Sequence, residues 1–330
     1  MSYCTHSTFW DTSEFVSYSL HIFGCVAFPI HLFGAYCILF KTPTTMKSVK
    51  CHLLNLHFWS CFLDLSLSVL ATPYLLFPSL SGYPLGLFKE VGLGTSEHVL
   101  YVMVSIGVLI VAMVQVFEVR FLIFIDASHW WRKIRITWFI INYLIAIVYI
   151  VPIYYLIPDQ VEGKKYVFNI FFSCVPKYID YDRVFVFVTD AASPMRFIGV
   201  MFLFFAIQVL LFAVLTGKLL RQQIKKRLSK NTINLQVKFQ RALILQILIP
   251  VLLLLPPAVY LGISNGFTIH IQYMNNISII IATSHGFFST IVLIAVQAPY
   301  REFLLKLIGF EIRFRSATPV QPVKISNFVT

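Results

Sequence analysis

Long apolar runs separated by short polar segments dominate the sequence. Seven runs carry at most one formal charge each, and about 20 helical residues are enough to cross the hydrocarbon core of a bilayer. None of them alternates strictly between apolar and polar positions, as a strand of a membrane barrel would. The pattern therefore predicts an all-α membrane protein, a bundle of seven transmembrane helices, at residues 16–40, 53–78, 99–117, 136–157, 197–216, 242–263 and 277–298.

Basic residues lie mostly in alternate connections between these runs. The connections 41–50, 120–135 and 217–241 and the tail 297–330 together hold 20 of the 26 Lys and Arg residues. Cytoplasmic loops carry such an excess, which predicts an external N-terminus and a cytoplasmic C-terminus. The expected organisation is an extracellular N-terminus (1–15), a seven-helix transmembrane domain (16–298) and a cytoplasmic tail (299–330).

Composition excludes several classes of function. Of 330 residues, 58% are hydrophobic and 12% are charged, against about 25% charged residues in an average soluble domain. The net charge of +12 follows from the cytoplasmic connections and does not indicate nucleic acid as a partner. The chain contains no G-x-x-x-x-G-K-[ST], H-E-x-x-H, C-x-x-C or G-x-S-x-G motif. We therefore expect no enzymatic activity, no cofactor and no metal site, and the lipid bilayer as the surroundings.

Among the polar side chains inside the predicted spans, three are candidates for a functional role. Asp64 is a carboxylate in the middle of the second span, where a charge costs about 2.5–3.5 kcal/mol and needs a partner or water. His57 precedes it by seven residues on nearly the same helix face, and His285 lies in the seventh span. Two interpretations stay open for this set: a ligand, ion or proton site that acts as a switch, or hydrogen-bonded packing contacts.

Prolines and cysteines add two further hypotheses. Pro250, Pro256 and Pro257 in the sixth span predict hinges, and the adjacent pair predicts a local break of the helix. Cys4 and Cys174 are the two cysteines on the predicted oxidising side, so a disulfide between them is one interpretation and two free thiols the other.

The cytoplasmic end of the third span reads Phe117-Glu118-Val119-Arg120. Its charged residues serve either as interfacial anchors or as a surface for a cytoplasmic partner. The connection 217–241 has eight basic and no acidic residues, with interleaved apolar positions. Such a segment suits anionic lipid and a partner protein equally well.

Several motifs resemble those of a nematode family of seven-helix chemoreceptors, serpentine receptor class H. They include Leu56-His57-Phe58-Trp59-Ser60, Thr72-Pro73-Tyr74, Gly82-Tyr83-Pro84-Leu85-Gly86, Cys174-Val175-Pro176, His285-Gly286-Phe287-Phe288-Ser289-Thr290 and Pro299-Tyr300-Arg301-Glu302-Phe303. The resemblance covers nearly the whole chain in order. It departs from the family after the third span, where the pattern Phe-Glu-Asn-Arg has Val119 in place of Asn, which leaves the hydrogen bonding there in question.

The resemblance implies a chemosensory G-protein-coupled receptor. It would lie in the plasma membrane, in the cilia of sensory neurons, bind a small external molecule and signal to a heterotrimeric G protein. The expected coupling residues are Glu118, Arg120, Arg221, Lys225, Lys226, Arg227 and Arg301. The alternative is a transporter or proton-coupled carrier that uses Asp64 and the span histidines, although carriers usually contain internal repeats and none is visible here.

Overall fold

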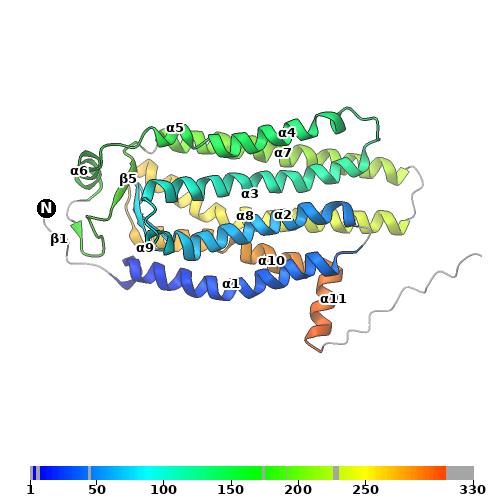
Figure 1. The fold of residues 1–330 in the computed structure, drawn as a ribbon, viewed down its shortest axis with the longest axis horizontal. Helices are drawn as coiled ribbons and strands as arrows, with labels where there is room; N and C mark the ends of the chain where they lie inside the picture. Colours follow the sequence, from blue (N-terminus) through cyan, green and yellow to red (C-terminus); the bar gives the residue numbers. More distant parts are fainter. Residues whose placement is uncertain are drawn as a thin grey trace, which may run out of the picture.

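The computed structural model describes residues 3–4, 8–43, 46–172, 175–190, 192–225 and 230–309. In this part, seven helices are long and apolar enough to cross a membrane, and they run along the long axis of the molecule (Figure 1). They comprise Ser13–Lys41, Lys47–Leu70, Thr95–Phe124, Trp131–Tyr154, Pro194–Gln222, Gln240–Phe267 and Gln272–Val296. Each overlaps one predicted run, so the seven-helix bundle is confirmed.

Several of the spans are built from more than one helical element. The second joins α2 (Lys47–Leu65) to a π-helical turn (Ser66–Leu70), the fourth joins α4 (Trp131–Val148) to α5 (Val151–Tyr154), and the seventh joins α9 (Gln272–Thr283) to α10 (His285–Val296). The other spans lie in α1 (Ser13–Lys41), α3 (Thr95–Phe124), α7 (Ala192–Lys225) and α8 (Lys230–Phe267). The single residue Ser284 separates α9 from α10 and divides the seventh span near its middle.

Helix α3 lies at the centre of the bundle and contacts α2, α4 and α7. Its buried side chains form much of the main hydrophobic core, including Val111, Val114 and Val116, each 0% exposed. A Cβ atom on Gly107 would lie 2.5 Å from the carbonyl oxygen of Ala146, so glycine is needed where α3 meets α4. Small residues let membrane helices approach this closely, and van der Waals packing then holds them together.

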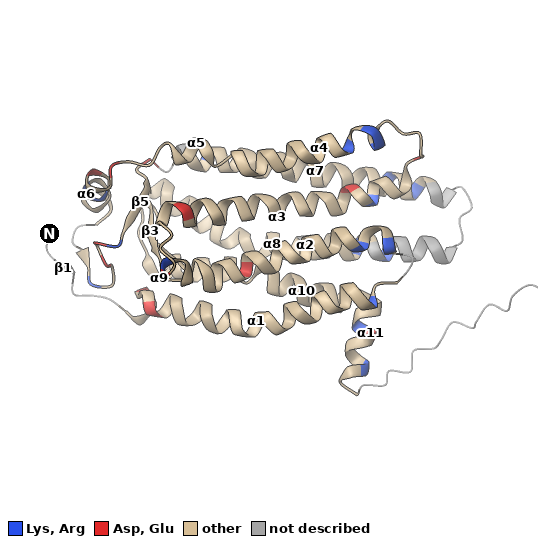
Figure 2. Ribbon diagram, viewed as in Figure 1, with Lys and Arg blue, Asp and Glu red and all other residues tan. Residues whose placement is uncertain are grey.

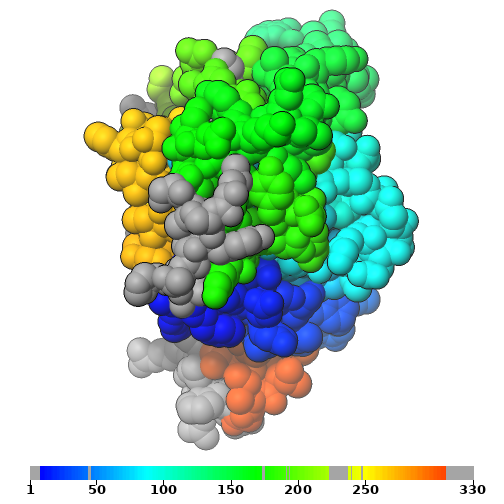
Figure 3. Space-filling model, turned by 90° about the vertical axis from the view of Figure 1, so that its left-hand side faces the viewer, coloured from blue at the N-terminus to red at the C-terminus, as the bar shows by residue number. Residues whose placement is uncertain are grey.

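A small β-structure covers one end of the bundle, which we call the cap end. Strands β2 (Pro73–Leu75), β3 (Leu80–Pro84) and β5 (Phe185–Val188) form an antiparallel sheet, and β1 (Tyr3–Cys4) pairs in parallel with β4 (Val175–Pro176). Seen from this end, the segment around α6 (Gln160–Phe171) and β5 (green) lies across the bundle, above α1 (blue) (Figure 3).

These strands add to the predicted helical bundle, and they correct the end of the second span. The predicted run 53–78 continues into β2, but the helix stops at Leu70. Thr72 has a positive φ of 41°, and Pro73 disfavours helical geometry in the residue before it. Residues 71–78 are therefore part of the cap and not of a membrane-spanning helix.

Lys and Arg gather at the opposite end, which we call the basic end (Figure 2). The chain turns there at Gln297 into α11 (Ala298–Leu307), which leaves the bundle axis (Figure 1). Its Tyr300 is fully buried, and the hydroxyls of Tyr300 and Thr42 are 2.7 Å apart. The Lys41 ammonium lies 4.1 Å from the centre of the Phe303 ring. These contacts attach α11 to the end of α1.

The predicted break at Pro256-Pro257 is wrong. Helix α8 continues without interruption through Pro250, Pro256 and Pro257. The breaks fall instead at Ser284 in the seventh span and between α4 and α5 in the fourth. In membrane helices, neighbouring helices and local adjustments can satisfy the backbone groups that proline leaves free, so proline alone does not locate a break. A hinge role for these three prolines stays a prediction.

Candidate functional site

Asp64 is the centre of a buried polar cluster that joins three helices. Its carboxylate is 2% exposed. One oxygen lies 3.1 Å from Nε2 of His31 on α1, and the other lies 3.1 Å from Nδ1 of His285 on α10. The backbone N–H groups of Gly286 and Phe287 donate to the same carboxylate at 3.3 and 2.8 Å. A single side chain of α2 therefore holds α1 and the seventh span together.

The break at Ser284 makes this arrangement possible. The first N–H groups of a helix have no partner inside the helix, and they carry partial positive charge. Because α10 begins in the middle of the span, its first N–H groups point at the Asp64 carboxylate. A Cβ atom on Gly286 would lie 2.6 Å from Oδ2 of Asp64 and 2.7 Å from Oγ of Ser60, so only glycine allows the carboxylate to come this close.

A second group of polar side chains surrounds His31. Its Nδ1 lies 3.1 Å from the hydroxyl of Thr290, which itself donates to the carbonyl of Gly286. Nε2 of His57 donates to the backbone carbonyl of His31 at 2.9 Å and lies 3.4 Å from Sγ of Cys61. The link between His57 and Asp64 thus runs through His31. The spacing of His57 and Asp64 on the helix suggested a direct contact instead.

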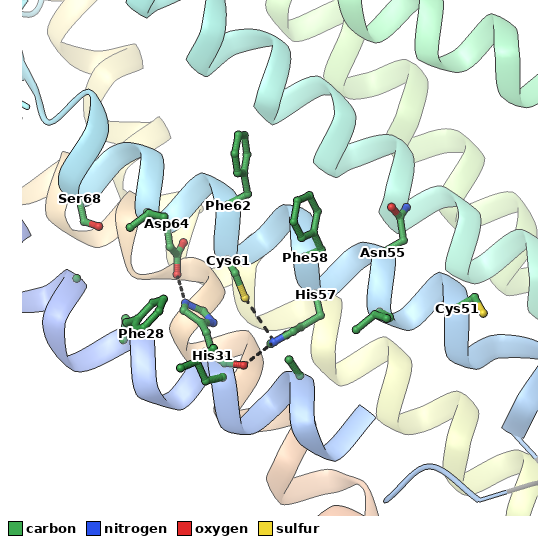
Figure 4. Close-up of a pocket in the computed structure, with 16 residues that line it drawn as sticks. Phe28, His31, Cys51, Asn55, His57, Phe58, Cys61, Phe62, Asp64 and Ser68 are labelled. Carbon is green, nitrogen blue, oxygen red and sulfur yellow. Dashed lines mark hydrogen bonds and ion pairs between the residues drawn. The ribbon is translucent and has the colours of Figure 1, made fainter. Parts of the chain in front are cut away.

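A groove of about 640 Å³ between α1 and α2 leads to this cluster. Phe28, Leu32 and Phe58 line it and are each more than half exposed. The deeper residues His31, His57, Cys61 and Asp64 line it as well, and Figure 4 shows them turned toward one another between the two helices. The site has the composition of a small-molecule pocket, apolar walls with a few convergent polar groups.

A second buried carboxylate, Glu118, lies near the basic end of α3 and is 0% exposed. Nε and Nη2 of Arg135 donate to its two oxygens at 3.0 and 2.9 Å, and the indole N–H of Trp131 donates to Oε1 at 2.7 Å. Both donors come from α4, so this bidentate pair joins α3 to α4.

Arg135 from α4 supplies the counter-charge of Glu118. Arg120, two positions further along α3, has surroundings of its own. Arg120 is 2% exposed, and its guanidinium lies 5.7 Å from the centre of the Phe124 ring. An interfacial anchor extends its charged group into water, so the burial of Arg120 does not fit the anchor interpretation.

The other predicted coupling residues are spread over the basic end. Arg221 is exposed on α7, and Arg301 donates to the carbonyl of Ala295 at 2.9 Å. Lys225 is the last residue of α7. Lys226 and Arg227 lie outside the described residues. Their part in coupling stays a prediction.

The predicted Cys4–Cys174 disulfide is not tested either. Cys4 lies in β1 opposite Pro176 of β4, two positions along the chain from Cys174. Cys174 itself lies outside the described residues. The backbone pairing agrees with the proposed connection between the N-terminal segment and the cap without establishing a bond.

The cap contains a further polar cluster around the carbonyl of Phe77. Nδ1 of His270 lies 2.6 Å from this oxygen, and Nδ2 of Asn275 donates to it at 3.1 Å. Burial lowers the pKa of His270, while its hydrogen bond to Phe77 and the charge of Asp11 oppose this effect. The cluster attaches the cap to the nearby end of the seventh span.

Sequence reasoning missed several partners in these clusters. His31 and Trp131 were visible in the sequence, but nothing in their local pattern indicates Asp64 or Glu118 as a partner. His31 and Asp64 are 33 positions apart, and Arg135 and Glu118 are 17 positions apart. The motif His285-Gly286 was the best available signal of a polar contact between helices. It puts glycine, which lets another group come close, directly after a polar residue inside a span.

Comparison with known proteins agrees with this architecture. The sequence model of the family described as serpentine type 7TM GPCR chemoreceptor Srh matches residues 11–310. Serpentine receptor class H-72 of Caenorhabditis elegans is 25% identical over 305 residues, which cover 90% of this chain and 86% of that protein. The crystal structure of squid rhodopsin superimposes with a TM-score of 0.54 at 11% identity, covering 93% of this chain and 88% of rhodopsin, which shows similarity of fold.

Proposed function

Because the chain belongs to the Srh family of serpentine seven-transmembrane GPCR chemoreceptors, we propose that it binds a small external molecule within the helix bundle and signals to a heterotrimeric G protein. Membership in a receptor family also disfavours the carrier alternative and an enzymatic activity. The plasma membrane, and specifically the cilia of sensory neurons, is the proposed location.

The Asp64 cluster is the observation that carries this proposal. One carboxylate contacts α1 and α10 through His31, His285 and two backbone amides. A molecule in the adjoining groove that binds one arrangement of these helices better than another shifts their equilibrium. Equal affinity for both arrangements would shift nothing, however tight the binding. The groove and its polar floor are therefore the proposed ligand site.

The seventh span offers a route to the other end of the molecule. Helix α10 begins at the Asp64 cluster and leads through Gln297 to α11, where Tyr300 meets Thr42. We assign coupling to the basic end, where the Glu118–Arg135 pair and the buried Arg120 lie beneath the exposed cations of α7 and α11.

A cell assay tests the ligand part of this proposal. Cells that express the receptor are screened with small apolar compounds that carry a polar group, with a second messenger as the readout. Asp64→Asn removes the negative charge at nearly constant size, and we expect it to abolish the response at equal surface density. Asp182→Asn, at an exposed position of the cap end, is the matched control. A normal response from Asp64→Asn would place the ligand site elsewhere.

Accessibility of an inserted tag tests the orientation. A tag between residues 225 and 230 should be labelled only after the cells are permeabilised, because the charge distribution puts this connection in the cytoplasm. Labelling of intact cells would contradict the proposed orientation and with it the assignment of the coupling surface.

A further inference from the structure

Three potential metal ligands meet at the floor of the groove between α1 and α2. One ligand atom each from His31, His57 and Cys61 lie within 4.8 Å of one another. His57 and Cys61 are four positions apart on α2 and share a helix face, while His31 faces them from α1 (Figure 4). No local motif reveals such a set, which is why the sequence predicted no metal site.

We propose that His31, His57 and Cys61 bind a borderline-soft transition metal ion, with Zn²⁺ as the best match. Two imidazoles and one thiolate are a donor set that suits zinc. A nitrogen at about 2.0 Å and a sulfur at about 2.3 Å from one tetrahedral ion lie roughly 3.5 Å apart. Nε2 of His57 and Sγ of Cys61 are 3.4 Å apart, so the pair already has the separation that the ion requires.

Asp64 provides a second, independent observation. A histidine that binds a metal usually donates its other ring N–H to a carboxylate, which orients the ring. Nε2 of His31 already lies 3.1 Å from Asp64, which leaves Nδ1 for the ion. The charges also balance, because two positive charges on the ion offset the Cys61 thiolate and the buried Asp64 carboxylate. A neutral assembly of this kind removes much of the cost of placing charge in a membrane interior.

Binding requires small changes in bonding. Cys61 releases its thiol proton to solvent, and His57 carries its proton on Nδ1 instead of Nε2. The contacts of His57 with the His31 carbonyl and of His31 with Thr290 give way to bonds with the ion. The fourth tetrahedral position faces the groove, where a water molecule or a donor atom of a small molecule can complete the coordination. The ion would thereby tie α1 to α2.

Titration of the purified full-length chain with Co²⁺, a spectroscopic substitute for Zn²⁺, tests this site without any reference to signalling. We expect a thiolate-to-cobalt charge-transfer band that saturates at one ion per chain and disappears when Zn²⁺ is added. Cys61→Ser should remove the band, and Asp64→Asn should weaken binding about 10- to 100-fold. Cys51→Ser, which changes another groove-lining cysteine of α2, should leave the band intact. Absence of the band in the parent chain, or its survival in Cys61→Ser, would overturn the proposal.

A measurement on the unmodified protein avoids any effect of substitutions on folding. Zn²⁺ should slow alkylation of Cys61 by a membrane-permeant maleimide at least about tenfold, as measured by mass spectrometry. Cys51, which is exposed, provides the reference in the same sample. Equal rates with and without Zn²⁺ at Cys61, or equal protection of both cysteines, would mean that these side chains form a hydrogen-bonded contact only.

Discussion

Among the described residues of the bundle, two carboxylates are buried, Asp64 and Glu118, and their charges are balanced in different ways. Glu118 faces the guanidinium of Arg135 in a bidentate pair, with the Trp131 indole as a third donor. Asp64 faces two imidazoles and two backbone amides, and its described partners include no lysine or arginine. Arginine supplies a fixed positive charge, whereas the imidazoles and backbone amides hold the Asp64 carboxylate through hydrogen bonds.

This difference separates a permanent contact from an adjustable one. The Glu118–Arg135 pair joins two helices that are adjacent in sequence, α3 and α4. The Asp64 cluster joins three helices, one of which begins at the cluster itself. A ligand or a metal ion can alter the second arrangement without breaking a guanidinium pair. We therefore assign ligand response to Asp64 and maintenance of the basic end to Glu118.

Removing the cation of the permanent pair should have the largest effect. Arg135→Ala leaves the fully buried Glu118 without its counter-charge, and breaking such a pair costs about 3–5 kcal/mol. Glu118→Ala should cost less, because Arg135 is 23% exposed and its side chain can extend to water. Thermal unfolding of the detergent-solubilised receptor measures both, with the exposed neighbour Lys133→Ala as control. Equal losses for the two variants would show that the pair does not behave as a buried ion pair.

Adding one methyl group at the adjustable site should have the next largest effect. Gly286→Ala places a carbon 2.6 Å from the Asp64 carboxylate, and relieving this contact should cost about 1–3 kcal/mol. Gly199→Ala and Gly262→Ala are matched controls, because no atom of another segment lies within 4 Å of an added Cβ there. We expect these controls to be neutral or slightly stabilising. Gly286→Ala should also lower the ligand response, and an unchanged response would separate α10 from ligand sensing.

The two carboxylates also show how far sequence reasoning reaches. The spans were predictable because an uncharged run of sufficient length has few alternatives to a membrane helix, and Asp64 stood out as the charge inside one. Its partner Gly286, 222 positions away, is specified by the packing of α2 against α10. Glu118 was recognised as a charged residue at the end of the third span, and the sequence named no partner for it. Its partner is Arg135, which the turn between α3 and α4 brings back beside it.

The cap was missed for a different reason. Its strands are only two to five residues long, β2 lies inside the predicted run 53–78, and β3 begins two residues after that run. In an apolar chain, a short buried strand such as Phe185–Val188 does not stand out from the helices around it. Pairing with distant strands decides its structure, and the sequence of the segment alone does not contain that information.

Arg120→Lys tests whether coupling depends on the neighbourhood of Glu118 or on Arg120 itself. Lysine keeps the charge but lacks the planar group that stacks over Phe124, so we expect unchanged surface density and about tenfold weaker ligand-driven signalling. Arg132 is a poor control, because it donates to the carbonyls of Leu122, Ile125 and Asp126 at the end of α3. Lys133→Arg is a better one, since Lys133 is exposed. If Arg120→Lys signals normally, coupling does not depend on the guanidinium of Arg120. The Glu118–Arg135 pair then remains as the candidate for coupling at this end of α3.

The smallest effect concerns His270, a partly buried imidazole outside the spans. No carboxylate among the described residues forms a hydrogen bond with it. Burial lowers its pKa, so in the folded chain it stays neutral at pH values where the unfolded chain, with a pKa of about 6.5, already takes up a proton. Stability should therefore decrease as the pH falls below about 6.5 and level off below the folded pKa.

His270→Gln keeps a donor for the Phe77 carbonyl and removes the titration. Thermal unfolding between pH 5 and 7.5 should therefore show a shallower pH dependence for this variant than for the parent, with the two curves closest at the upper end. The nearby titratable groups are Asp11 and Tyr178, and both remain in the variant. The difference between the curves thus isolates the imidazole, at no more than about 1.4 kcal/mol for each unit of pKa difference. Parallel curves would mean that His270 does not contribute to acid sensitivity.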